Sequence, residues 1–205
     1  MIECFVLAGG QSRRFGEDKL LYKIGDKRTI EHTTETLKRV CDRVCVVVKD
    51  VDKFHFLKGV EFIKDLLERQ YAIAGLYTAL KSLCGERALV ISGDMPLIKE
   101  EVIKHLWINC SPPLTLYKIK GKYYHLFAVY YKELLEPLED YIEKGGKRLM
   151  DFVLNFPLKV LEEEEVWPYD PELVSFINMN TKEEARLIIE LYKSGKKFNL
   201  YRDGL

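Results

Sequence analysis

The sequence lacks several features that would place the protein in a special class. No apolar stretch approaches the roughly 18 residues that a membrane-spanning helix needs. No basic group precedes the first apolar stretch, so no signal peptide is expected. No charge of one sign is in excess, because 32 Lys and Arg residues balance 32 Asp and Glu residues. We therefore expect a cytoplasmic protein whose partners include neither nucleic acid nor membrane.

Cysteine and histidine are too scarce and too dispersed to form a recognisable site. The cysteines contain no CxxC pair, so we expect reduced, mostly buried thiols instead of a disulfide framework. The histidines show no zinc-ligand spacing. These residues are Cys4, Cys41, Cys45, Cys84 and Cys110, and His32, His55, His105 and His125.

The sequence does contain enough apolar material for one large core. It has 205 residues, 47% of them hydrophobic, and shows neither an internal repeat nor a linker. We expect a single domain over residues 1–205.

In the first half of the chain, short apolar runs alternate with segments of helical periodicity. The runs predict buried strands at 2–7, Arg43–Val48, 60–64 and 88–92, and the periodic segments predict helices at Thr29–Val40, 72–84 and 99–108. Strands that alternate with helices are typical of parallel βαβ units with right-handed crossovers. The expected fold is therefore α/β, with three layers (α/β/α) and a mostly parallel, Rossmann-like sheet.

The second half is less regular. Residues Leu114–Ile119 and 123–130 predict an antiparallel pair of strands joined at Gly121. The four glutamates at 162–165 predict a solvated loop. The other expected elements are helices at 132–144, 147–155 and 181–193 and a strand at 158–161.

The chemistry of the sequence is concentrated in residues 7–19, LAGGQSRRFGEDK, directly after the first predicted strand. Glycines there allow backbone N–H groups to converge on an anion, and cations surround them. Open α/β sheets place ligands at this end of their strands. A tight turn with solvated arginines is the alternative, but the density of glycines and cations favours phosphate binding. These residues are Gly9, Gly10 and Gly16, and Arg13, Arg14 and Lys19.

This loop is neither of two common nucleotide-binding loops. The dinucleotide fingerprint requires GxGxxG, and the P-loop requires GxxxxGK[ST]. Gly10 and Gly16 are spaced wrongly for both, and Lys19 is followed by Leu20 instead of Ser or Thr. The sequence therefore argues against NAD binding and against P-loop hydrolysis of an NTP.

Residues 7–19 resemble the signature of molybdenum cofactor guanylyltransferases, LAGGxSxRMGxDK, with Phe15 in place of Met. Two further positions depart from the family: Lys49 stands where relatives often have Asn, and His125-Leu126 where they commonly have His-Pro. Further matches follow in the family's order along the chain: Ile63-Lys64-Asp65, Ala74-Gly75-Leu76, Ser92-Gly93-Asp94-Met95-Pro96, and Asn178-Met179-Asn180-Thr181-Lys182-Glu183-Glu184, which is similar to NxNTPE.

The resemblance implies an enzyme that transfers GMP from Mg²⁺-bound GTP to the phosphate of molybdopterin carrying molybdenum, with release of pyrophosphate. About residues 1–110 would bind the nucleotide, and about 111–205 the acceptor. Transient contacts with cofactor-biosynthesis proteins or acceptor oxidoreductases are also implied. The implied roles are catalytic for Lys19, Arg13 and Asp94, nucleotide-binding for Leu7, Ala8, Gly9, Gly10, Lys19, Asp65 and Asp94, and metal-binding for Asp94.

These roles have structural alternatives. Asp94 suits Mg²⁺, which prefers oxygen ligands, and we expect it at an open cleft, but an Asp before Met-Pro is also an ordinary turn residue. Asp65 can contact guanine or ribose, or cap a helix. Capping also competes for the asparagines, of which Asn178 is the better site candidate. Lys147 and Arg148 are candidates for holding the acceptor phosphate, or merely solvated cations.

Two other functions are compatible with these residues. A sister nucleotidyltransferase would move another nucleotide or use another phosphorylated acceptor, as a molybdopterin cytidylyltransferase does. Cytidylyl-transferring relatives tend to have LAAG, and the Gly-Gly of residues 7–10 leaves more room for a purine. A non-catalytic cofactor-binding chaperone would not require the metal-holding carboxylate of Asp94.

Overall fold

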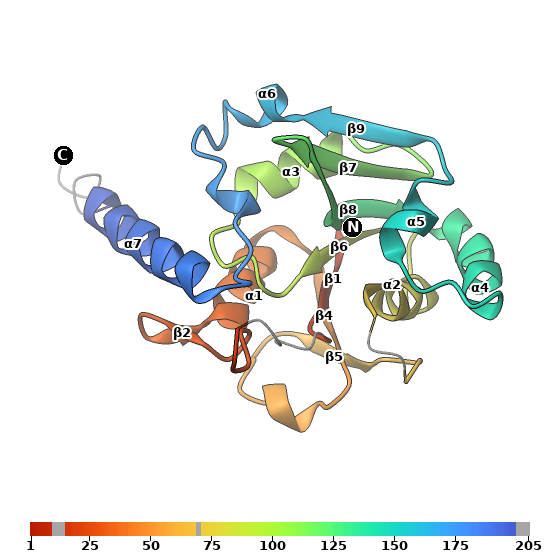
Figure 1. The fold of residues 1–205 in the computed structure, drawn as a ribbon, viewed down its shortest axis with the longest axis horizontal. Helices are drawn as coiled ribbons and strands as arrows, with labels where there is room; N and C mark the ends of the chain where they lie inside the picture. Colours follow the sequence, from red (N-terminus) through yellow and green to blue (C-terminus); the bar gives the residue numbers. More distant parts are fainter. Residues whose placement is uncertain (10–14, 69–70, 200–205) are drawn as a thin grey trace.

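A seven-stranded sheet in the order β5-β4-β1-β6-β8-β7-β9 forms the centre of the molecule, with helices on both of its faces (Figure 1). The structure is a computed structural model that describes residues 1–9, 15–68 and 71–199, the last four of these by backbone alone. The predicted three-layer α/β/α fold is confirmed. Within the described ranges, no helix is both long enough and apolar enough to cross a membrane.

The first half of the chain builds the parallel part of the sheet. β1 (Glu3–Leu7) lies between β4 (Arg43–Val48) and β6 (Arg87–Ser92) and is parallel to both, and β4 is parallel to β5 (Glu61–Lys64). These strands are apolar runs because both faces of the sheet are covered. Their carboxyl ends lie along one edge of the sheet.

Alternate residues of the strands point to opposite faces of the sheet and pack into two separate cores. One core packs β1, β4 and β6 against α1 (Thr29–Val40) and α3 (Glu100–Ile108), and includes Leu37 and Ile103. The other packs the opposite face against α2 (Ala72–Lys81) and includes Leu76. Each large apolar side chain that is fully buried in these cores stabilises the fold by roughly 1.5–3 kcal/mol.

The second half adds the antiparallel strands and extends the same sheet. β8 (Lys122–Tyr131) is antiparallel to both β6 and β7 (Leu114–Ile119), and β9 (Leu158–Glu162) is parallel to β7. The β7–β8 pair is as predicted. Its turn has φ of 49° at Lys120 and 75° at Gly121, and positive φ at both central positions is the geometry that two-residue hairpins favour.

Helices of the second half cover the sheet face that α2 covers. α4 (Leu135–Glu143) follows the 3-10 turn η2 (Lys132–Leu134), and α5 (Leu149–Val153) follows Gly145 and Gly146. Both are shorter than the helices that the periodicity predicts. Their buried residues, Leu138 and Phe152, belong to the α2 core.

The predicted loop at the glutamate run is wrong. Glu162 ends β9, and the next residues form the short helix α6 (Glu163–Val166). The carboxylate of Glu165 accepts a hydrogen bond of 2.8 Å from the Glu162 N–H, which is the acidic half of a capping box. Acidic side chains favour the first turn of a helix because they meet the positive end of its dipole.

The expectation that every cysteine is a free thiol is also wrong, because Cys4 and Cys41 form a disulfide. Cys4 lies in β1 and Cys41 follows α1, and the crossover returns the chain to the start of β1. There the N–H groups of Asp42 and Arg43 both donate to the Ile2 carbonyl. The pair is 37 residues apart in sequence, so linear spacing did not reveal it. The free cysteines are Cys45, Cys84 and Cys110.

The last helix, α7 (Lys182–Asn199), lies beside the small β2–β3 hairpin (Lys23–Ile24 and Lys27–Arg28), which the sequence analysis did not predict (Figure 1). A third core joins them, in which Phe15 and Ile24 pack with Met179 and Ile188. This core connects the residues that precede Lys19 to the asparagine-containing segment ahead of α7.

Candidate active site

A cavity of about 340 Å³ opens at the sheet edge where β1 and β6 end. Of the predicted site residues, Leu7, Gly9, Lys19 and Asp94 line it. Asn178 and Asn180 line it as well. The structure therefore brings together residues from the beginning, the middle and the end of the chain.

Asp94 is positioned by the turn after β6. The Gly93 N–H donates to the Leu7 carbonyl at 3.2 Å, which ties this turn to the end of β1. The Asp94 carbonyl accepts from the Met179 N–H at 2.9 Å. Asp94 is only 2% exposed although it lines the cavity, so the expectation of an open position is wrong.

The Asp94 carboxylate is the centre of a polar cluster. Its Oδ2 pairs with the Lys19 ammonium, and its Oδ1 accepts from the Asn178 side-chain amide at 2.9 Å. Lys19 also donates to Oδ1 of Asn180 at 2.8 Å. Because the carboxylate is almost fully buried, it needs these charge-assisted hydrogen bonds, and loss of its cation would leave an uncompensated charge.

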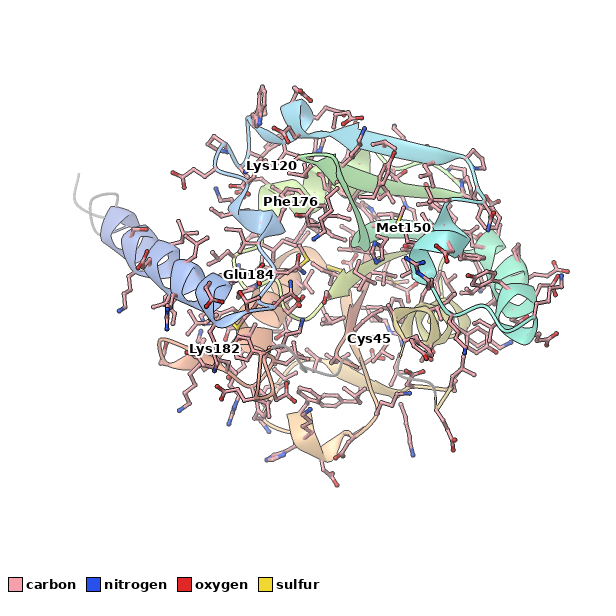
Figure 2. The ribbon with its side chains drawn as sticks, in the orientation of Figure 1. Cys45, Lys120, Met150, Phe176, Lys182 and Glu184 are labelled. Atoms are coloured by element: carbon pink, nitrogen blue, oxygen red, sulfur yellow. A yellow bond between two sulfur atoms is a disulfide. The ribbon has the colours of Figure 1, made fainter. Side chains whose placement is uncertain are left out.

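The capping alternative for the Asn180 side chain is wrong. Glu184 accepts from the backbone N–H groups of Asn180 (2.8 Å) and Thr181 (2.9 Å), and the Thr181 hydroxyl accepts from the Glu184 N–H. Figure 2 shows Glu184 on the first turn of α7, directed toward the body of the molecule. Since this capping box satisfies the helix start, the side chain of Asn180 is available to Lys19.

The glycine-rich loop is described in part. The Ala8 N–H donates to the Val47 carbonyl at 3.0 Å, and Ala8 is buried without lining the cavity. A Cβ built on Gly9 would meet nothing within 4 Å, so this position is open toward the cavity. Gly10 and Arg13 lie outside the described residues, and their roles stay predictions.

Asp65 lies at the same sheet edge but does not line the cavity. Its Oδ1 accepts from the Thr78 hydroxyl (2.9 Å) and the Leu67 N–H (3.2 Å), and the Lys49 ammonium lies 3.3 Å from Oδ2. The N-cap of α2 is Tyr71, so the capping alternative for Asp65 is wrong. Lys49 also donates to the Leu67 carbonyl, and the two residues together fix the segment after β5.

Lys147 and Arg148 are exposed ahead of α5, and neither lines the cavity. The Arg148 guanidinium lies 3.6 Å from Asp151 one turn along the helix. This placement agrees with the alternative that they are solvated cations.

One wall of the cavity was missed by the sequence analysis. The first five residues of β8, 122–126, all line the cavity, as Lys19 and Asp94 do. We call them the β8 wall. The only signal in the sequence was the departure at His125-Leu126, because the other residues of the wall read as part of an ordinary strand.

The described residues contain no group of three or more His, Cys, Asp or Glu side chains that could hold a metal ion. Asp94 is the single carboxylate among the described residues that line the cavity. One carboxylate is compatible with Mg²⁺, which is commonly held by one or two carboxylates together with substrate phosphates and water. The Mg²⁺ site stays a prediction.

Comparison with known proteins gives consistent similarities. A family model described as MobA-like NTP transferase domain matches residues 4–158. A probable molybdenum cofactor guanylyltransferase of Aquifex aeolicus (strain VF5) is 41% identical over 188 residues, which cover 92% of this chain and 90% of that protein. The molybdenum cofactor guanylyltransferase of Desulfosudis oleivorans is 30% identical, covering 93% and 96%. The crystal structure of molybdopterin-guanine dinucleotide biosynthesis protein A from Archaeoglobus fulgidus is similar with a TM-score of 0.82 at 26% identity, covering 94% and 100%.

Proposed function

Since the chain belongs to the MobA-like NTP transferase family, we propose that it transfers GMP from GTP to the phosphate of molybdopterin carrying molybdenum. The products are the guanine dinucleotide form of the cofactor and pyrophosphate. The names of the relatives support the guanylyl group and the acceptor. The observation that carries the proposal is the cluster of Lys19, Asp94, Asn178 and Asn180 in one cavity.

The reaction is an in-line displacement. An oxygen of the acceptor phosphate bonds to the α-phosphorus of GTP as the bond to the pyrophosphate oxygen breaks. Such a step needs positioning and charge neutralisation more than covalent chemistry. Among the residues that the structure describes, no free cysteine lines the cavity, in agreement with a mechanism that has no covalent enzyme intermediate.

Lys19 supplies positive charge where the triphosphate lies. Its side chain is 20% exposed and reaches the cavity from the loop after β1. It pairs with Asp94 and Asn180, which hold it in place. We infer that the phosphates take over part of this pairing when GTP binds, and that Lys19 then stabilises the charge that develops on the leaving pyrophosphate.

The donor set around Asp94 fits a divalent cation. Its carboxylate and the side-chain amides of Asn178 and Asn180 offer the oxygen atoms that Mg²⁺ prefers, and a reversed Asn178 amide would present its oxygen instead of its nitrogen. Asp94 would hold the ion, with the asparagines next to it. When bound, Mg²⁺ would neutralise the phosphates and orient the triphosphate for attack.

The test is pyrophosphate release from each of the four NTPs, with and without molybdenum-loaded molybdopterin, and with and without Mg²⁺. We expect release only with GTP, acceptor and Mg²⁺ together. Equal rates with CTP would replace the guanylyl proposal by a cytidylyl or unselective transferase. Tight binding of acceptor without any release would favour a cofactor-binding chaperone.

Base selection is tested separately by calorimetry. We expect GTP to bind more tightly than CTP, and a Gly9→Ala variant, which has the LAAG sequence, to narrow or reverse the preference because a methyl group takes space in the cavity. Equal affinities of the parent protein for the two nucleotides would refute the argument from the Gly-Gly sequence.

A further inference from the structure

The β8 wall, residues 122–126, departs from regular strand geometry. Leu116 of β7 lies opposite Ala128, whereas Lys118 lies opposite Tyr123, so two steps along β7 correspond to five along β8. An ordinary bulge adds one residue, and this one adds three. Bulges break the alternation of side chains, which explains how five consecutive residues of one strand line the same cavity.

Contacts on both sides hold this three-residue bulge in a fixed shape. The Tyr124 hydroxyl donates to the Phe176 carbonyl at 3.0 Å, and its ring packs edge-on against the Phe176 ring. The Lys122 ammonium lies 4.9 Å from the centre of the Tyr124 ring. From the other side, the buried Tyr130 hydroxyl donates to the His125 carbonyl at 2.7 Å. Contacts within the protein therefore fix the shape of the wall.

His125 is the residue of this wall whose hydrogen bonding is incomplete. Its Nδ1 is buried and makes no hydrogen bond of good geometry within the described part of the chain, although the backbone of Tyr123 lies close to the ring. Buried polar atoms are normally paired, and an unpaired one at a cavity calls for an explanation. Nε2 is not buried in this way, and the residue lines the cavity, so Nε2 is the nitrogen that a molecule in the cavity can reach.

The surroundings of the imidazole favour its neutral form. Burial lowers its pKa, and the Lys122 ammonium lowers it further, while the nearby Tyr123 carbonyl acts in the opposite direction. A neutral imidazole offers one N–H donor and one lone pair, whereas a protonated one offers donors alone. This combination suits the edge of a nitrogen heterocycle, where donors and acceptors alternate, better than it suits a phosphate.

We propose that His125 is an acceptor-binding residue, which hydrogen-bonds the nitrogen heterocycle of the phosphorylated acceptor while the β8 wall holds it against the nucleotide. The inference rests on the proposed function, because it assigns the acceptor side of that cavity. His125 lies at the same edge of the sheet as Asp94 and lines the same cavity: the paired residues Ile91 and Phe127 lie three residues before Asp94 and two after His125. No proton transfer is assigned to it, since a phosphate monoester with a second pKa of about 6 is already mostly dianionic at pH 7.

The test separates acceptor binding from nucleotide binding. His125→Phe keeps a ring of similar size and removes both nitrogens, and His125→Gln keeps a hydrogen-bonding group. With molybdopterin varied at saturating GTP, we expect His125→Phe to raise the acceptor KM about 5- to 30-fold, the loss typical of one or two buried hydrogen bonds. His125→Gln should recover part of this loss, and the affinity for GTP should change less than twofold in both variants.

His55→Phe is the matched control. His55 is exposed, lies outside the cavity, and bonds the Asp52 carbonyl of its own turn. The acceptor KM and the affinity for GTP of this variant should equal those of the parent protein. An unchanged acceptor KM in His125→Phe, or an equal rise in the KM for GTP, would overturn the proposal.

Equilibrium binding distinguishes this inference from the proposed function. Molybdopterin binding is measured by its fluorescence, without GTP, for the parent protein, His125→Phe and His125→Gln, after thermal melts have shown that each is folded. Weaker binding by His125→Phe supports the inference even if the parent protein does not use GTP, in which case only the proposed reaction fails. Equal binding of molybdopterin by the parent protein and by His125→Phe, or no binding by the parent protein, refutes the inference.

Discussion

The two sides of the cavity differ in how they are built. The proposed nucleotide side (Leu7, Gly9, Lys19 and Asp94) consists of the end of one parallel strand and of turns that follow such strands, whereas the β8 wall consists of residues that begin an antiparallel strand. The first side carries the charged pair. The second carries aromatic rings, a neutral imidazole and one exposed lysine. A surface with a charged pair suits a triphosphate, and a mainly aromatic one suits a heterocycle.

This difference teaches where site residues are to be sought. In a parallel sheet, side chains after the strands meet at one edge, so motifs such as Gly93-Asp94 are found by their place after a strand. β8 runs in the opposite direction, and its beginning lies at that same edge. Functional residues of a mixed sheet therefore also stand before the antiparallel strands.

The largest effect on the contrast between the two sides of the cavity is expected from Asp94→Ala. Loss of the carboxylate should lower turnover by about 100-fold or more, because a positioned electrostatic stabiliser of the transition state is removed. GTP binding measured without metal should change little. Asp94→Asn keeps the shape of this buried side chain and controls for misfolding. Full Mg²⁺-dependent turnover in either variant would contradict the assignment of Asp94.

A double-mutant cycle on Lys19 and Asn180 should have the next largest effect. Lys19→Ala should weaken GTP binding and slow turnover together, by about 10- to 100-fold, because its ammonium faces the phosphates in both states. Asn180→Ala should cost less, since Asn180 acts by holding Lys19. The double variant should then lose little more than Lys19→Ala, with a coupling of about 0.5–3 kcal/mol.

Lys147→Ala is the control for this cycle, because Lys147 is exposed and lies outside the cavity. It should leave the rate unchanged and combine additively with Lys19→Ala. Additive losses for Lys19 and Asn180 as well would show that the two residues work independently.

Gly75→Ala tests the packing below the nucleotide side. A Cβ at this helix position would lie 2.9 Å from Cδ1 of Leu7, which lines the cavity. Overpacking should cost about 1–3 kcal/mol, or about 2–4 °C in Tm per kcal/mol for a chain of this size. Gly9→Ala, with open space around its Cβ, should leave Tm unchanged. Equal melting temperatures for the two variants would show that Leu7 yields without cost.

The smallest effect on activity is expected far from both sides of the cavity, where Arg43 bonds Glu3 and Glu61. Burial raises the pKa of Glu3, but hydrogen bonds from Arg43 and from backbone N–H groups outweigh it, and the net pKa is lowered. Arg43 also lowers the pKa of Glu61. A lowered carboxyl pKa stabilises the fold above the usual value of about 4.5, and this stability is lost as pH falls through the folded-state value.

The Tm should therefore be steady from pH 7 to about pH 5 and fall below about pH 4.5. Arg43→Gln should lower Tm at pH 7 and flatten the acid fall, while turnover at pH 7 stays unchanged. An equally steep fall of Tm with pH in Arg43→Gln would show that carboxyl groups other than Glu3 and Glu61 cause the loss of stability in acid.

The sequence predicted those parts of the molecule that depend on local pattern. Alternating apolar runs and helices predicted the parallel half, and the strand-end motif predicted that Asp94 would lie near Lys19. The sequence did not show which groups bind a given carboxylate. The Asp65 carboxylate accepts hydrogen bonds from the Thr78 hydroxyl and a backbone N–H, and it pairs with Lys49. Such pairing depends on packing between elements, which has no linear signal.

The β8 wall was beyond the sequence for a second reason. Its role depends on a register shift between two strands, and the identity of its residues does not reveal where the partner strand pairs. The short hairpin β2–β3 also could not be predicted, because its two-residue strands are set by packing against α7. Local propensity specifies neither the register of β8 nor this hairpin.

The Cys4–Cys41 disulfide closes a covalent ring that contains the whole of residues 7–19 and the β2–β3 hairpin. A protease that cuts once inside this ring breaks the backbone but does not separate the fragments. The nicked protein would migrate as one band on a denaturing gel without reductant and as two bands with it. The segment that we propose to contact the phosphates thus lies inside a ring closed by one covalent side-chain bond, and the gel reports whether that bond is present in the cell.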